Sequence, residues 1–252
     1  MVFILVFPKS DYDLHFGSDQ AELYSSASKI LNLKLEFIGH PSVWGFSHPG
    51  PALRIYFQIV YLLSFGNIFL FFLVDTLFKL SLLFYSKNRL SKTLKINLDI
   101  PFLFMLSSSY FIFLIKTPWA HGIVAVGFFL CVVFLVEEKY VHLFVLLNIL
   151  IQVNIISVIP FAFIVLINFK NWVFEIRDKF MKYSLIVLIL WSLPVFEVLK
   201  NKGGNFLKIF TVVFQKEEYR NLTVSSNIVS LFINFTFLCF FLLYQSFLLL
   251  RE

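Results

Sequence analysis

Charged side chains are scarce in this 252-residue sequence, where Asp, Glu, Lys and Arg together make up only 14% of the residues. Soluble domains usually carry about 25% charged residues, so the composition argues against a water-soluble globular protein. Apolar residues take their place: 59% of the chain is hydrophobic, 35 residues are Phe, and the mean hydropathy is +0.85. The composition therefore predicts a chain that lies mostly in lipid.

Cysteine is scarce too, with only Cys131 and Cys239, each in an apolar run. Two such residues give no zinc or disulfide framework, and we interpret both as small core or lipid-facing side chains. A cleavable signal pattern is absent, because the opening MVFILVFP is short and has no basic start; we interpret it as the stub of a first membrane helix. The net charge of +6 does not indicate nucleic acid, because the basic residues cluster between apolar runs.

The apolar runs predict an all-α, polytopic membrane protein with about seven to eight membrane helices, forming one transmembrane domain over residues 1–252. A membrane span needs about 20 apolar residues, and lipid requires the backbone of each span to satisfy its own hydrogen bonds. The predicted segments are an interfacial helix and a span in 51–85, spans at 99–115 and 123–136, two short helices in 141–169 with a turn near 154–160, and spans at 183–198 and 226–250.

Basic residues predict the orientation of these helices. The stretch 86–95 carries four basic residues and no acid, which is typical of a cytoplasmic loop. Two long polar loops, 9–50 and 199–225, then lie on the outer face. The second loop holds five basic residues, an excess that the same rule does not expect there. Either these residues bind an anionic ligand or the topology differs at this loop.

Acidic residues in the first outer loop are candidate catalytic groups. Residues 19–32 lack Pro and Gly, which predicts a short helix with Ser18 as its N-cap. Asp19 then has two interpretations. It is a carboxylate favoured near a helix N-terminus, or it is a general base or metal-assisting group at the membrane surface. Spacing alone favours the first.

The first loop ends in GHPSVWGFSHPGPALRIYF, residues 39–57, which contains two His-Pro steps. Each Pro pushes the preceding His toward extended backbone, so His40 and His48 are expected on a stiff turn. There they hydrogen-bond a phosphate or lie in the membrane interface; a metal site needs more ligands than these two. Arg54 suits a phosphate through its bidentate geometry, or it reaches toward lipid headgroups.

Two polar pairs interrupt the apolar runs. Asp75 and Lys79 are four residues apart on one predicted helix face, so we expect them to neutralise each other. Gln152 and Asn154 fall in the middle of a predicted membrane segment, where hydrogen bonds between helices are the expected role.

Four stretches resemble, in order, the GT-C superfamily of membrane glycosyltransferases, whose members include lipid-phosphosugar-dependent mannosyl- and arabinosyltransferases. These stretches are GSDQAELY (17–24), GHPSVWGFSHPGPALRIYF (39–57), ILIQVNIISVIPF (149–161) and LWSLPVFEVLKNKGGNFLKIFTVVF (190–214). The resemblance implies transfer of a sugar, with inversion, from a polyprenyl-phosphate donor to a glycan, lipid or protein acceptor. It also implies a multi-pass protein of the prokaryotic inner membrane that acts at the outer face.

The resemblance also implies roles for residues. Asp19 matches the catalytic base by position, Glu22 is the second choice, and Asp11 and Asp13 are further candidates. Candidates to bind substrate or stabilise the leaving phosphate are His40, His48, Arg54, Lys116, His121, Lys200, Lys202 and Asn205. A need for a divalent cation stays open.

Members of the superfamily usually continue with more helices, so the resemblance implies a short or truncated member. The alternative is a non-catalytic membrane subunit that binds or moves a lipid-linked sugar, with a partner subunit. In both cases the expected partners are the lipid bilayer and a polyprenyl-phosphate sugar, and no nucleic acid is expected.

Overall fold

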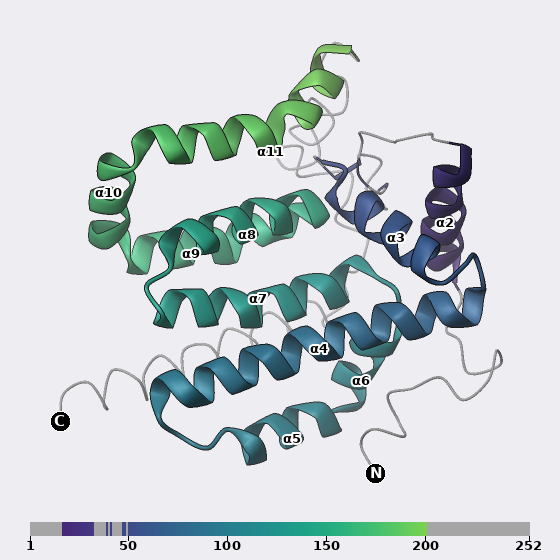
Figure 1. Cartoon of the computed structure of the whole chain (residues 1–252), viewed down its shortest axis with the longest axis horizontal. Helices are drawn as coiled ribbons and strands as arrows, with labels where there is room; N and C mark the ends of the chain where they lie inside the picture. The colour runs from purple at the N-terminus through teal and green to yellow at the C-terminus, as the bar shows by residue number, and fades with distance from the viewer. Residues whose placement is uncertain (1–16, 33–38, 40, 42–46, 49, 201–252) are drawn as a thin grey trace, which may run out of the picture. The chain divides into compact units, whose positions relative to one another are not determined.

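A computed structural model of the chain describes residues 17–32, 39, 41, 47, 48 and 50–200 (Figure 1). Within them the all-α prediction is confirmed, because the one β feature is an isolated antiparallel bridge between Pro41 and Ser47. The elements are α2 (Ser18–Ser28), the 3-10 helix η2 (Lys29–Asn32), α3 (Ala52–Leu63), α4 (Ile68–Leu94), α5 (Asp99–Ser107), α6 (Ser109–Lys116), α7 (Ala120–Val136), α8 (Tyr140–Val153), the 3-10 helix η3 (Ile155–Ser157), α9 (Val158–Ile167), α10 (Phe169–Asp178) and α11 (Phe180–Lys200).

A tight turn separates α3 from α4, as the sequence predicts for two helices within 51–85. Phe65 and Gly66 both take positive φ angles, 52° and 69°, and the Asn67 side chain accepts a hydrogen bond from the Leu70 N–H at 3.0 Å to begin α4. The predicted end at residue 85 is wrong, because α4 continues to Leu94. The stretch 86–95 lacks Pro and Gly and is rich in Lys, Arg and Leu, which are good helix formers.

Among the described residues, α4 alone is a single helix long and apolar enough to cross a membrane. Its 27 residues span about 40 Å, more than the ~30 Å of a bilayer's hydrocarbon core. The span predicted at 99–115 is not one straight helix, because α5 and α6 bend by 81° at Ser108; together they form a broken span or a re-entrant loop. Ser107 donates a hydrogen bond to the Phe104 carbonyl at 2.7 Å, the kind of local bond by which Ser competes with the helix backbone.

The predicted turn near 154–160 is confirmed, because α8 ends at Val153 and the 3-10 helix η3 follows. The Asn154 side chain accepts a hydrogen bond from the Ile156 N–H at 3.1 Å and so begins η3. Two other predicted boundaries differ: α7 begins at Ala120 rather than 123, and α11 covers 180–200 with Pro194 inside it. The predicted count of seven to eight membrane helices stays a prediction.

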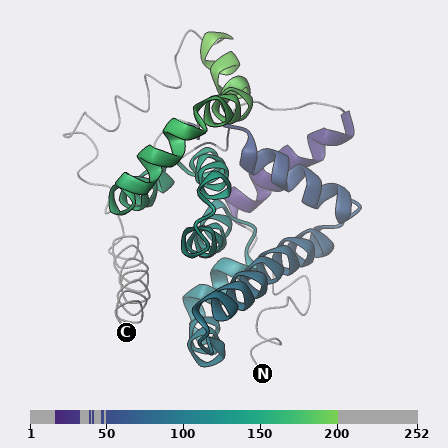
Figure 2. The ribbon, with the colours of Figure 1, turned by 60° about the vertical axis from the view of Figure 1, so that its left-hand side comes forward.

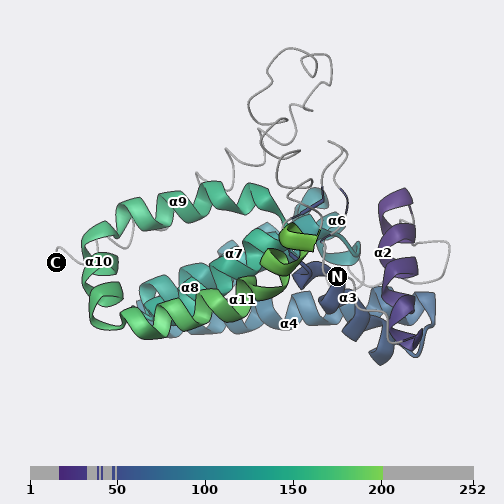
Figure 3. The ribbon, with the colours of Figure 1, turned by 90° about the horizontal axis from the view of Figure 1, so that it is seen from above.

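The helices α4, α7, α8 and α11 pack in that order, each against the next, and Figure 1 shows them one above another. At one end of this row, α2 packs across α3, as Figure 2 shows most clearly, and α3 packs on both α4 and α8. Seen from above in Figure 3, α10 joins the ends of α9 and α11. The core around α3 is formed by Leu23, Ala27, Leu53, Phe57, Val60, Tyr61, Phe71, Phe72, Ala120 and Val153.

At the other end of α4, Glu137 ties the helix to the α7–α8 turn. Both Nε and Nη2 of Arg89 contact the Glu137 Oε1 atom, at 2.7 and 2.6 Å. Lys139 Nζ lies 2.8 Å from Oε2. Hydrogen bonds from Arg89, followed by those from Lys139, lower the pKa of Glu137 from 4.5 to about 2. The carboxylate side chain is only 8% exposed.

We expect Glu137→Gln to lower thermal stability at pH 7 and to remove a pH dependence. A carboxyl whose pKa is depressed stabilises the fold above its unfolded pKa, and this contribution is lost as pH falls from about 4.5 toward 2. Thermal unfolding in detergent between pH 2 and 7 checks this. The control is Glu138→Gln at the exposed neighbouring position. Equal losses below pH 4.5 in the wild type and Glu137→Gln would contradict the assignment.

Candidate functional site

The helix that carries Asp19 begins one residue earlier than predicted. The Gly17 N–H donates to the Gln20 Oε1 atom at 3.0 Å, and Gly17 is the N-cap, so the assignment of Ser18 as N-cap is wrong. The reason is that the Gln20 side chain turns back over the helix start and satisfies a backbone donor there. Asp19 lies in the first turn, half-buried, and makes no hydrogen bond or ion pair to another described residue.

His121, in the first turn of α7, interacts electrostatically with Asp19. Burial lowers the pKa of the His121 imidazole below its usual value, and the charge of the Asp19 carboxylate partly opposes this shift. The two residues belong to the first turns of α7 and α2. The Trp119 ring lies against the imidazole, with centroids 4.1 Å apart. The His121 Nδ1 atom is buried and has no hydrogen-bond partner among the described residues. The charge of Asp19 therefore influences an imidazole that is 102 positions away in the sequence.

Glu22, the second acidic candidate, is engaged with Arg54. Arg54 Nη2 lies 3.1 Å from the Glu22 Oε1 atom, and Arg54 Nη1 donates to the Ser26 Oγ atom at 2.6 Å. These contacts join α2 to the first turn of α3. Arg54 and Glu22 thus form part of the packing between two helices, which distinguishes Glu22 from Asp19.

The HPGP turn (48–51), which precedes α3, packs against the break between α8 and α9. The His48 Nδ1 atom accepts a hydrogen bond from the Ile155 N–H at 3.3 Å, and the side chain is buried. The Gly39 N–H donates to the His48 carbonyl at 3.2 Å. A Cβ atom on Gly39 would lie 2.7 Å from that same carbonyl, so glycine is required where the two ends of the loop meet.

Gln152 connects the HPGP turn to α11. A Cβ atom on Gly50 would lie 2.4 Å from the Gln152 Oε1 atom, so the turn rests directly on this side chain. Gln152 Nε2 donates to the Leu190 carbonyl at 2.6 Å. Trp191 Nε1 donates to the Asn148 Oδ1 atom at 2.9 Å. The expected hydrogen bond between helices is therefore present for Gln152, whereas the Asn154 bond is local to η3.

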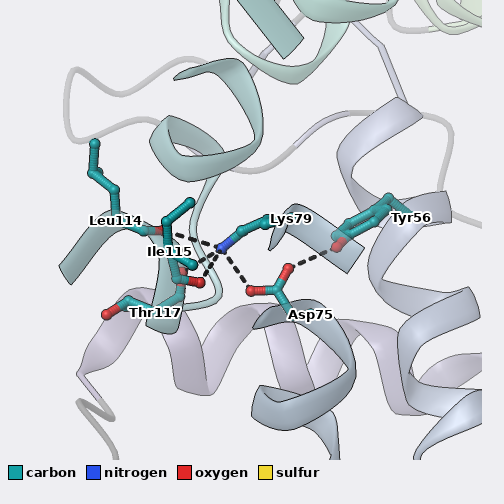
Figure 4. Close-up of polar contacts among 6 residues, drawn as sticks. All are labelled: Tyr56, Asp75, Lys79, Leu114, Ile115 and Thr117. Atoms are coloured by element: carbon teal, nitrogen blue, oxygen red, sulfur yellow. Dashed lines mark hydrogen bonds and ion pairs between the residues drawn. The ribbon is translucent and has the colours of Figure 1, made fainter. Parts of the chain in front are cut away.

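A second polar cluster lies inside the bundle, where α3, α4 and the end of α6 meet (Figure 4). Lys79 Nζ lies 2.6 Å from the Asp75 Oδ2 atom, and the Tyr56 hydroxyl donates to Asp75 Oδ1 at 2.7 Å. The exposed fractions of the Asp75 and Lys79 side chains are 0% and 1%. The prediction that this pair neutralises itself is confirmed. Its lysine has a further role.

The Lys79 ammonium also holds the last turn of α6. It donates to the carbonyls of Thr117 at 2.7 Å, Leu114 at 3.2 Å and Ile115 at 3.4 Å. Carbonyls at a helix C-terminus have no partner within the helix, and a cation there also suits the helix dipole. Four oxygen atoms therefore surround Lys79 Nζ.

Gly122 allows the turn between α6 and α7 to close on this cluster. A Cβ atom on Gly122 would lie 2.2 Å from the Leu114 carbonyl oxygen and 2.9 Å from Lys79 Nζ. The sequence gives no signal for this role, because closeness to Leu114 and Lys79 arises only when the helices pack. Tyr56 was missed for the same reason: it lies on α3, and its partner Asp75 lies on α4.

We expect Gly122→Ala to reduce strongly the yield of folded protein, because a backbone carbonyl cannot move aside as the end of a side chain can. Size-exclusion chromatography and thermal unfolding in detergent measure this. The matched control is Gly17→Ala, where the added Cβ would meet only the Gln20 side chain, at 3.1 Å. A Gly122→Ala protein as stable as the control would contradict the close approach.

Of the remaining candidates, only Lys116 has a described side chain, and it makes no hydrogen bond or ion pair to the other described candidates. Lys116 is half-buried at the end of α6, and Lys200 is the last residue of α11. The Lys200 side chain and the whole of His40, Lys202, Asn205, Asp11 and Asp13 lie outside the described part of the chain, as does 201–225 of the second outer loop. In the described ranges, no group of three or more His, Cys, Asp or Glu side chains could hold a metal ion.

The segments 17–24, 39–57 and 149–161 meet around α3. The helix α2 packs on α3, the HPGP turn leads into α3, and α3 contacts α8. No family model matches the chain, and neither a curated protein nor a solved structure matches it. What can be said of function comes from the residues and their geometry.

Proposed function

We propose that this chain is a membrane glycosyltransferase of the GT-C type, which transfers a sugar from a polyprenyl-phosphate donor to an envelope acceptor. The observation that carries the proposal is the contrast between the two acids of α2. Glu22 is paired with Arg54 at 3.1 Å. Asp19 is half-buried, makes no hydrogen bond or ion pair to another described residue, and acts electrostatically on His121.

An acid kept out of helix packing beside an imidazole suits a general base. In the proposed step, an acceptor hydroxyl oxygen attacks the anomeric carbon of the sugar and its proton passes to the Asp19 carboxylate. The bond between the anomeric carbon and the phosphate oxygen breaks, and polyprenyl phosphate leaves with the electron pair. Attack from the face opposite the phosphate inverts the configuration. Lys116 and His121, on either side of the α6–α7 turn, are the described candidates to stabilise the phosphate.

The proposed setting is a multi-pass protein of a prokaryotic inner membrane. The length and hydropathy of α4 support membrane association. The shorter apolar helices α3 and α7 pack beside it, α8 packs on α7, and α11 packs on α8. The basic end of α4, which includes Lys87, Arg89 and Lys92, is assigned to the cytoplasm. This orientation puts the start of α4, with α2 and α3 beside it, at the outer face, where a lipid-linked sugar is used.

A second candidate function is a non-catalytic subunit that binds or moves a lipid-linked sugar. The observation in its favour is that two proposed phosphate ligands are engaged inside the protein. Arg54 contacts Glu22 and Ser26, and His48 accepts a hydrogen bond from the Ile155 N–H. A phosphate would have to displace these contacts to use either group.

Purified protein in proteoliposomes tests both functions. Radiolabelled polyprenyl-phosphate mannose and polyprenyl-phosphate arabinose are offered with a membrane extract as the source of acceptors. Release of polyprenyl phosphate together with label in the acceptor supports the transferase. Binding of the donor without release supports the non-catalytic subunit.

A further inference from the structure

Burial of an ion pair is weak evidence that the cluster around Lys79 stabilises the packing of α4 against its neighbours. Replacing a buried ion pair by apolar residues of similar volume is often neutral or stabilising, and the cluster is flanked by the apolar side chains of Phe72, Leu80, Leu83 and Ile115. An all-apolar contact would pack equally well. The Asp75–Lys79 pair is more specific than an apolar contact, because its hydrogen bonds to particular carbonyls form in only one register of the helices.

We infer that Lys79 is a positioning residue that fixes the α6–α7 turn and thereby sets where His121 lies relative to Asp19. The chain of contacts is continuous. Tyr56 on α3 orients Asp75, Asp75 orients the ammonium, and the ammonium takes three carbonyls at the end of α6 (Figure 4).

The chain of contacts ends one residue from His121. A Cβ atom on Gly122 would meet both Lys79 Nζ and the Leu114 carbonyl. The cluster therefore restricts the backbone next to His121. Trp119 packs on the imidazole from within the same turn. A turn that shifts relative to α4 would change the distance between His121 and Asp19, because Asp19 is carried by α2 and not by this turn.

The catalytic importance of this placement rests on the proposed function, but the placement itself can be tested without substrate. The measurement is the pH midpoint for modification of His121 by diethyl pyrocarbonate, read by mass spectrometry of the His121 peptide. In otherwise wild-type protein, Asp19→Asn removes the anion that acts on the imidazole. We expect that substitution to shift the midpoint to lower pH, because it removes the charge that favours the protonated imidazole.

The same comparison is then made in the double variant Asp75→Leu/Lys79→Met, which keeps an apolar cluster but removes the directional bonds. We expect a folded protein in which Asp19→Asn no longer shifts the midpoint. Tyr56→Phe, which removes a single hydroxyl, is the milder second variant, and we expect it to reduce the shift by about half. If the double variant does not fold, the size of the Asp19→Asn shift in Tyr56→Phe tests the inference on its own.

An undiminished shift in Tyr56→Phe, and in the double variant where it folds, would overturn the inference. A lost shift supports it whether or not the protein transfers sugar. If Asp19→Asn keeps full transfer activity, the proposed function fails while the placement of His121 by Lys79 stands, so the two failures are distinguishable. Where transfer is measurable, we expect the double variant to lower kcat more than it raises KM, because positioning acts on the reacting groups.

Discussion

Lys79→Met should leave little folded protein. The substitution removes the ammonium but keeps a side chain of similar length, so the main effect is electrostatic. The Asp75 carboxylate, 0% exposed, would keep only the Tyr56 hydroxyl, and three carbonyls at the end of α6 would lose a donor. Breaking a buried ion pair by removing one partner costs about 3–5 kcal/mol, a large part of the ~5–15 kcal/mol that stabilises a typical domain.

Thermal unfolding of the purified protein in detergent measures this loss, with Lys92→Met as control. Lys92 is on the same helix but is exposed, and surface substitutions usually change stability by less than about 0.5 kcal/mol. Asp75→Leu/Lys79→Met should recover most of the stability, because neither charge is left without its partner. A Lys79→Met protein as stable as Lys92→Met would show that the pair does not act as an ion pair in the folded state.

Asp19→Asn should reduce sugar transfer by about 10²–10⁴-fold, the usual contribution of a general base. The amide has nearly the same shape as the carboxylate but cannot take the proton of the acceptor. Asp19 makes no hydrogen bond or ion pair to another described residue, so its replacement should leave the amount and thermal stability of the protein unchanged. The reaction in proteoliposomes, with donor in excess, gives the rate.

Glu22→Gln is the matched control, because it makes the same chemical change one turn further along α2. It weakens the contact with Arg54 at 3.1 Å and should lower stability modestly, since this pair is partly exposed. Transfer by the folded fraction should remain. Full activity in Asp19→Asn, or loss of activity in Glu22→Gln alone, would remove Asp19 from the role of base.

Helix boundaries could be predicted from the sequence where residues close in the chain decide the conformation. The break after α8 follows from Asn154, whose side chain caps η3. The extent of α4 was underestimated because the basic stretch 86–95 was interpreted as a loop, although nothing in it stops a helix. The kink at Ser108 was missed because a run of serines allows both a continuous helix and a break.

The sequence by itself determined the helical class, the apolar character of the chain, the pairing of Asp75 with Lys79 and the presence of two acids on α2. These follow from composition and from spacing within one helix. Only the tertiary structure decided that Glu22 is paired with Arg54 and that Lys79 holds the carbonyls of α6. The physical reason is that each of these contacts joins two helices, and spacing along the chain does not record which helices pack together.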